Sequence, residues 1–268
     1  SDPDVWHAVQ DEARRQVLAT AGHVTNEVGL ARALAAGQQV EHLDGAVLEL
    51  LPADAAERRI PFAQIPPPAV IAAAAQASDT TLQALAERVA QSGNYQVPTL
   101  ALFERIVALD ISTDALLARP EMRFVPEQAL RDWSAQRDQL RAAGFTAADG
   151  RALRDLRRRI VRAYRDAGVP LMAGSDTAQA FHIWGPGLIE ELETLVAAGL
   201  GPMDALRAAT VVPRNYFAAS PGSGSALGWT ANFGVVKEGA RADLIVLRDD
   251  PSVNISALRS LEMVVAGG

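Results

Sequence analysis

The pattern of apolar and polar positions predicts helices that alternate with short strands over the first 220 residues. Apolar residues at helical spacing predict helices at 3–15, 27–36, 80–91, 188–198 and 202–210, and a long helical insertion over 113–166. Short apolar runs closed by turn residues predict strands at 16–22, 38–42, 95–100 and 169–174. Strands that alternate with helices form parallel βαβ units, so this pattern indicates an α/β protein.

The last part of the chain has a different pattern. Strand-like runs at 234–236, 243–248 and 261–266 are joined by turn residues, with no long helix between them. A Ser-Pro-Gly-Ser-Gly-Ser stretch at 220–225 predicts a flexible junction. We therefore divide the chain into a β/α domain over residues 1–220 and a small β segment over residues 221–268.

The N-terminus has the signature of a helix start, with Asp2 as the N-cap and Pro3 at the first helical position. It lacks the basic start and apolar stretch of a secretory signal. The longest apolar run, 69–75, is too short to span a bilayer, so we expect no membrane partner. A chain that opens on a helix with no preceding element suggests a piece of a longer protein. The compartment stays open between the cytoplasm and the periplasm or secretion.

Composition narrows the classes of function. The 32 acidic and 25 basic residues give a net charge of −7, and no Lys/Arg-rich run occurs, which argues against a nucleic-acid partner. The absence of cysteine excludes zinc–cysteine sites, iron–sulfur clusters and cysteine nucleophiles. At 49% hydrophobic residues the chain can bury a sizeable core. All the basic residues are arginine except Lys237.

Possible metal ligands follow three of the predicted strands. His23, His42 and Asp176 each stand near the carboxyl end of a strand, where β/α proteins carry their reactive residues. Each has a plainer explanation alone, because a single histidine is commonly a hydrogen-bonding core residue and Asp176 could be a helix N-cap. Together they form the His and carboxylate set of a catalytic divalent-metal site, with zinc as the expected ion.

Other residues near these strand ends are candidates for supporting roles. His182 and Thr99 are candidate substrate contacts, although a surface loop histidine and a strand terminator would look the same. Ser175 and Thr177 flank Asp176 and are expected to hold it in place rather than to react. The arginines at 151, 154, 157, 158, 159 and 162 are predicted to form the solvated face of a helix.

The order of motifs along the chain resembles that of metal-dependent amidohydrolases, in their imidazolonepropionase and Xaa-Pro dipeptidase (prolidase-like) branch. The matching motifs are Gly22-His23-Val24, Glu41-His42-Leu43-Asp44-Gly45, Ala173-Gly174-Ser175-Asp176-Thr177 and Ala242-Asp243-Leu244-Ile245-Val246-Leu247. The resemblance implies the second half of a (β/α)8 TIM-type barrel, with strands like the fifth to eighth, and part of a small β-sandwich.

The resemblance also implies roles for the site residues. His23 and His42 would bind the second metal, and Asp176 would bind the first and act as general base toward the metal-bound water. The metal would lower the pKa of that water and polarise the scissile carbonyl. The implied substrate is a small molecule with an amide, lactam, carbamate or dipeptide C–N bond.

The sequence departs from the family at two places. The His-x-His pair of the first barrel strand is absent, and Lys237 lies in the small β segment, where it cannot be the lysine that bridges two metals. We therefore expect the chain to need its N-terminal half, or a partner in a homo-oligomer, to complete the site. The alternatives are a non-catalytic half-barrel that binds or oligomerises through uncovered strand edges, and a mononuclear deaminase-like member.

Overall fold

A short parallel sheet organises the first part of the chain. The computed structural model describes residues 2–62, 64–219 and 232–268. Strands β1 (Ala21–Gly22), β2 (Gln39–Glu41) and β3 (Gln96–Val97) pair in parallel in that order. The registers Gly22↔Val40 and Val40↔Gln96 align their carboxyl ends on one edge of the sheet. The α/β class is confirmed, and three of the four strands expected in residues 1–220 are present, each shorter than predicted.

The fourth expected strand, at 169–174, is not formed as a strand. Its chain lies beside β3 in the parallel direction, with one bridge from Gln96 to Leu171. Pro170 has no N–H to donate, and Ala173 donates its N–H to the carbonyl of Ala208 at 2.9 Å instead of to a neighbouring strand. The segment therefore follows the sheet for about one pair of residues and then leaves it.

Helices surround this sheet, and most follow the predicted pattern. The helices are α1 (Pro3–Arg15), α2 (Leu30–Ala35), α3 (Ala46–Glu49), α4 (Pro68–Ala75), α5 (Asp79–Ser92), α6 (Leu100–Ile106), α7 (Thr113–Leu117), α8 (Glu127–Ala142), α9 (Ala147–Asp166), α10 (Pro186–Ala197), α11 (Pro202–Ala208) and α12 (Val211–Ala219), with short 3-10 turns η1 (Ala56–Arg59), η2 (Pro120–Phe124) and η3 (Ile255–Arg259).

Local capping explains several of the helix ends. Asp2 caps α1 as predicted, accepting the Asp4 N–H at 2.9 Å. The second helix begins at Leu30 rather than at residue 27, because Gly29 before it has a φ of 77°. The predicted strand at 95–100 ends at Val97, because Pro98 lacks an N–H and Thr99 turns the chain with a φ of 47° into α6.

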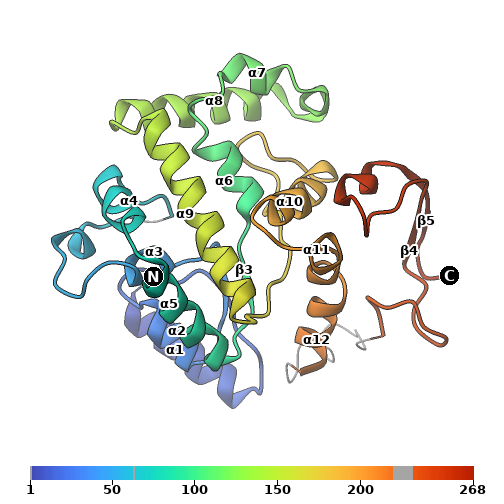
Figure 1. Ribbon diagram of the computed structural model, residues 1–268, viewed down its shortest axis with the longest axis horizontal. Helices are drawn as coiled ribbons and strands as arrows, with labels where there is room; N and C mark the ends of the chain where they lie inside the picture. The colour runs from blue at the N-terminus through green and yellow to red at the C-terminus, as the bar shows by residue number, and fades with distance from the viewer. Residues whose placement is uncertain (1, 63, 220–231) are drawn as a thin grey trace.

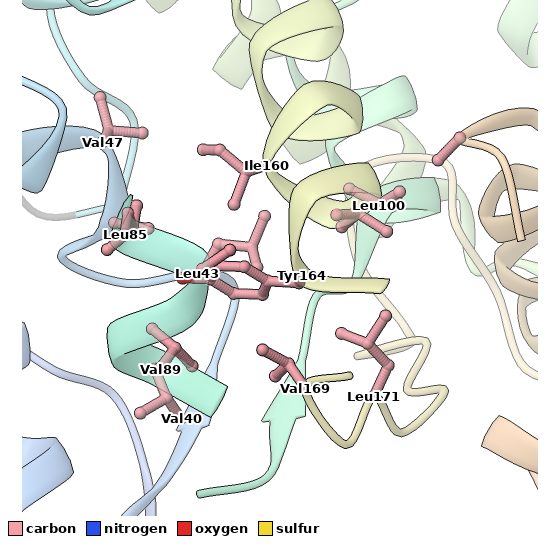
Figure 2. Packing of buried hydrophobic residues seen from close by; sticks show 14 of the residues in the cluster. Val40, Leu43, Val47, Leu85, Val89, Leu100, Ile160, Tyr164, Val169 and Leu171 are labelled. Carbon is pink, nitrogen blue, oxygen red and sulfur yellow. The ribbon is translucent and has the colours of Figure 1, made fainter. Parts of the chain in front are cut away.

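The insertion over 113–166 is helical, as expected, and consists of α7, η2, α8 and α9. Helices α7 and α8 project to one end of the molecule, and α9 runs back from them along the sheet (Figure 1). Figure 2 shows Tyr164 of α9 packed near Val40, Leu43, Val89 and Val169. Tyr164 is fully buried, and burying a large apolar side chain stabilises a fold by about 2 kcal/mol, so its packing joins α9 to the strands.

The C-terminal part forms an antiparallel ribbon of β4 (Leu244–Leu247) and β5 (Leu261–Val265). Residues 234–236, predicted as a strand, are not one, because Gly234 lies in a bend with a φ of 75°. Between the strands, η3 packs Ile255 and Leu258 into the core beside α10 and α11. The predicted boundary at 220–221 lies outside the described residues.

The ribbon presents apolar side chains on both of its faces. Ile245 and Val264 pair on one face, and Val246 and Met263 pair on the other. These four side chains are between 45% and 62% exposed.

The described residues contain no helix that is long and apolar enough to cross a membrane.

Glu191 of α10 is fully buried at the start of α6, where its carboxylate accepts the Ala101 N–H at 2.7 Å. Burial raises the pKa of Glu191 from 4.5 to about 7, against the effects of the backbone hydrogen bonds and of Arg157. The folded protein therefore binds this proton more tightly than the unfolded chain does.

We expect the free energy of unfolding to fall by about 3 kcal/mol through this group as pH rises from 4.5 to above 7. The Glu191→Gln variant should lose that slope in urea titrations at a series of pH values. Glu193→Gln, on the same helix, serves as the control and should keep the slope, because its pKa is lowered by Arg259. An unchanged slope in Glu191→Gln would contradict the assignment.

Candidate active site

His42 stands at the carboxyl end of β2, between the ends of the neighbouring strands. Its φ of 57° turns the chain out of the strand, and its side chain is buried. The Nδ1 atom lies 2.7 Å from Oγ1 of Thr99, which follows β3. The Nε2 atom lies 3.7 Å from Oδ2 of Asp176. The ring is thus held through one nitrogen and directed toward Asp176 through the other.

His23 follows β1 and stacks on His42. The ring centroids are 4.6 Å apart and the planes are inclined by 23°. Nδ1 of His23 lies 2.9 Å from Oδ2 of Asp44, and the same carboxylate oxygen accepts the Val24 N–H at 3.1 Å. Asp44 thereby fixes both the ring and the backbone beside it, a role that sequence reasoning missed. Its position two residues after His42 was the available signal.

Asp176 follows the segment beside β3, in a left-handed conformation with a φ of 48°. Its Oδ2 accepts a hydrogen bond from Nε2 of Gln179 at 2.6 Å. The structure therefore brings His23, His42 and Asp176 together from three separate segments. Within the described ranges, however, no group of three or more His, Asp or Glu side chains is arranged to hold a metal ion as it stands.

The donor chemistry of this cluster suits a divalent metal. Each histidine places Nδ1 against an oxygen, which is the arrangement that fixes the ring of a metal-ligating histidine. Nε2 of His42 faces Asp176, whereas Nε2 of His23 lies 3.2 Å from Nε2 of Gln64, which a bound metal would have to displace. Burial, with the charges of His23 and Arg157, lowers the pKa of His42 to about 3, so its imidazole is neutral, the form that ligates. Two histidines and one carboxylate could serve one zinc ion, but they are too few for two.

Two carboxylates near the cluster have raised pKa values. Burial raises the pKa of Glu41, and the nearby Asp176 raises it further. Burial also raises the pKa of Asp44, which the hydrogen bond from His23 opposes.

The flanking residues Ser175 and Thr177 were expected to hold Asp176. Their hydroxyls lie 3.3 Å from each other. Among the residues that the structure describes, the side chain that bonds the Asp176 carboxylate is Gln179. Thr99, a candidate substrate contact, is buried against His42.

His182, the other candidate substrate contact, is fully buried rather than placed in an open loop. Its Nδ1 lies 3.2 Å from Oε2 of Glu190, and its Nε2 has no hydrogen-bond partner among the described residues. Residues 179–182 form a tight turn closed by two backbone bonds, and both central residues, Ala180 and Phe181, have positive φ. Such a turn normally carries Asn or Gly, so the surroundings must hold it in place.

The insertion supplies that support. Phe181 packs in a cluster with Leu116, Met122 and Trp133. Arg119 donates to the carbonyl of Phe181 at 2.8 Å and pairs with Glu190, which also lies 3.2 Å from Arg105. Burial would raise the pKa of Glu190, but His182 and the two arginines hold it at about 2.

The arginine-rich stretch of α9 is not simply a solvated face, and the prediction is wrong for Arg157. That side chain is 3% exposed and donates to the carbonyls of His42 at 2.7 Å and Pro98 at 2.6 Å. Its guanidinium lies 3.5 Å from the ring centre of Phe103. The signal in the sequence was its helical spacing from Leu153 and Ile160, which puts it on the apolar face.

We expect the free energy of unfolding of the Arg119→Ala variant to be lower by about 3 kcal/mol. The substitution removes one of the cations that pair with the carboxylate of Glu190, which stays largely buried. Urea denaturation at neutral pH measures the loss. Arg131→Ala, which breaks an exposed pair with Glu127 in the same insertion, should change the free energy by less than about 0.5 kcal/mol. Equal effects of the two substitutions would refute the anchoring role of Arg119.

Comparison with known proteins supports the family suggested by the motifs. No curated protein sequence matches the chain. A bottromycin amidohydrolase structure matches with a TM-score of 0.65 and 26% identity, covering 98% of this chain and 52% of that one. An A. niger ochratoxinase matches with a TM-score of 0.59 and 19% identity, covering 100% of this chain and 45% of that one.

A putative prolidase from Bifidobacterium longum is also similar, with a TM-score of 0.52, 21% identity, and coverage of 97% of this chain and 48% of that one. The chain thus spans about half the length of the solved structures it matches. The family model described as "Amidohydrolase family" matches residues 1–268. The chain therefore belongs to the amidohydrolase family.

Proposed function

We propose that this chain carries part of the active site of a metal-dependent hydrolase that cleaves C–N bonds. The observation that carries the proposal is the meeting of His23, His42 and Asp176 at one edge of the sheet. Membership of the amidohydrolase family supports the reaction class, because enzymes of this family generally use divalent metals. Zinc is the expected ion, because two histidines and a carboxylate are among its catalytic ligand sets.

The residues of this chain have two roles in the proposed reaction, metal binding and proton transfer. His23 and His42 would hold the metal through Nε2, and Asp176 would bind it through its carboxylate. The metal supplies Lewis acidity toward a water molecule and the scissile carbonyl. Asp176 accepts a proton from the attacking water and delivers it to the leaving amine as the C–N bond breaks. Gln179, bonded to Oδ2, leaves the other oxygen of Asp176 available for this transfer.

The substrate proposed is a small molecule with an amide, lactam, carbamate or dipeptide C–N bond. The similar solved structures include a prolidase, an amidohydrolase and an ochratoxinase, which supports this class without selecting a member of it. We propose that the remaining metal ligands come from a second polypeptide segment, either the other half of a barrel or a second copy of this chain. Lys237 supports this proposal, because it lies in the C-terminal part and not on the sheet that carries the histidines.

A second candidate function is association without catalysis. The exposed apolar faces of the β4–β5 ribbon favour it, because a two-stranded ribbon needs a further layer to be stable. In that case His23 and His42 would be hydrogen-bonding residues at the strand ends, and metal binding would play no part.

We expect isothermal titration of the chain with Zn²⁺ at neutral pH to show one site. His42→Ala and Asp176→Asn should each weaken its affinity at least tenfold, since each removes one of three donors. His7→Ala is the matched control, because His7 lies exposed on α1, and its affinity should equal that of the unsubstituted chain.

Zinc binding that both site variants retain in full would contradict the proposal and favour the association function. Hydrolysis is tested on the same proteins with a panel of X-Pro dipeptides and N-acyl amino acids. Any turnover that belongs to this site must fall at least a hundredfold in Asp176→Asn, because general-base groups contribute about that much or more.

A further inference from the structure

Arg157 is a buried cation whose hydrogen-bond partners are backbone carbonyls. Among the described residues, no carboxylate oxygen lies within 4.0 Å of its guanidinium nitrogens, the limit for an ion pair. Both terminal nitrogens instead bond carbonyl oxygens, Nη1 that of His42 at 2.7 Å and Nη2 that of Pro98 at 2.6 Å. The guanidinium face rests on Phe103, 3.5 Å from its ring centre. A planar group held on three sides in this way has a fixed orientation.

The two carbonyls belong to two neighbouring strands at the point where each strand ends. His42 follows β2, and Pro98 follows β3 and precedes Thr99. The residues at both ends, His42 and Thr99, have left-handed backbones, with φ of 57° and 47°. The side chains of these same two residues bond each other, Nδ1 to Oγ1, at 2.7 Å. Arg157 therefore binds the backbone of both strand ends that carry the His42–Thr99 hydrogen bond, which orients the His42 ring.

We propose that Arg157 is a positioning residue for His42: by tying the two strand ends together it keeps Nδ1 of His42 on Thr99 and Nε2 toward Asp176. The role rests on the proposed function, in which His42 holds a metal. It requires the two-pronged guanidinium rather than positive charge alone, because a lysine ammonium is a single point of donation and cannot hold two carbonyls in a fixed plane.

Other arginines of α9 make contacts that separate this role from general stabilisation. Arg154 and Arg158 pair with Glu104. Arg159 binds two carbonyls as Arg157 does, those of Ala75 at 3.1 Å and Ala77 at 2.7 Å, but these lie at the end of α4. Arg159→Lys is therefore a matched control, since it removes the same kind of contact from the same helix away from His42.

The test is a long-range ¹H–¹⁵N imidazole spectrum of the metal-free chain labelled in histidine, which holds four histidines. We expect the two ring nitrogens of His42 to show the separate shifts of a single tautomer. In Arg157→Lys they should move toward one averaged value, and in Arg159→Lys they should stay where they are. Thr99→Val should give the same change, and adding it to Arg157→Lys should add nothing, because both act through one hydrogen bond.

Unchanged His42 shifts in folded Arg157→Lys would overturn the proposal and leave Arg157 a purely structural residue. Should that variant fail to fold, Arg157→Met fills a similar volume without a buried charge and must give the averaged shifts for the proposal to stand. In the zinc titration, Arg157→Lys should weaken affinity about 10- to 100-fold. Zinc affinity that is unchanged in His42→Ala and Asp176→Asn, together with the expected shift changes in Arg157→Lys, would refute the proposed function and keep the role of Arg157.

Discussion

The parallel pairing of β2 with both of its neighbours is the constraint on which the rest of the site depends. With Gly22 opposite Val40 and Val40 opposite Gln96, the three strands end level, and the residues that follow them meet. Side chains alternate between the two faces of a strand, so a slip of one residue in either pairing would turn His42 to the opposite face. The donors of the site are thus determined by backbone hydrogen bonds a few residues away from them.

The strands are too short to hold this register through their own hydrogen bonds, and buried charged side chains add hydrogen bonds that hold the strand ends. Arg157 ties the ends of β2 and β3 from the α9 side, and Glu191 of α10 caps the start of α6 just beyond β3. Glu190, one residue earlier, fixes the loop after Asp176 through His182 and Arg119. Burying these groups costs stability, as the raised pKa of Glu191 and the lowered pKa of Arg157 show. These buried charged groups lie beside the residues where the chain turns through left-handed backbone conformations.

Sequence patterns predicted the α/β alternation, two strands near the C-terminus and the proximity of His23, His42 and Asp176, because these follow from periodicity and from the geometry of parallel sheets. They did not predict the loss of the strand at 169–174, since the competing bond from Ala173 to Ala208 joins residues distant in sequence. The burial of His182 was missed for the same reason, whereas the position of Arg157 between Leu153 and Ile160 on one helix face did indicate burial, although its carbonyl partners could not be inferred. A charged side chain is predicted to face solvent unless its partners are known, and those partners lie on other segments.

The β4–β5 ribbon has a consequence for how a free copy of this chain behaves over time. An edge strand with apolar side chains on both faces can add a strand from any neighbour, and the bonds it makes are those of its own backbone. The rate of such encounters rises with the square of protein concentration. Dilution would then lengthen the lifetime of the monomer, so the concentration at which the protein is kept would decide how fast it associates.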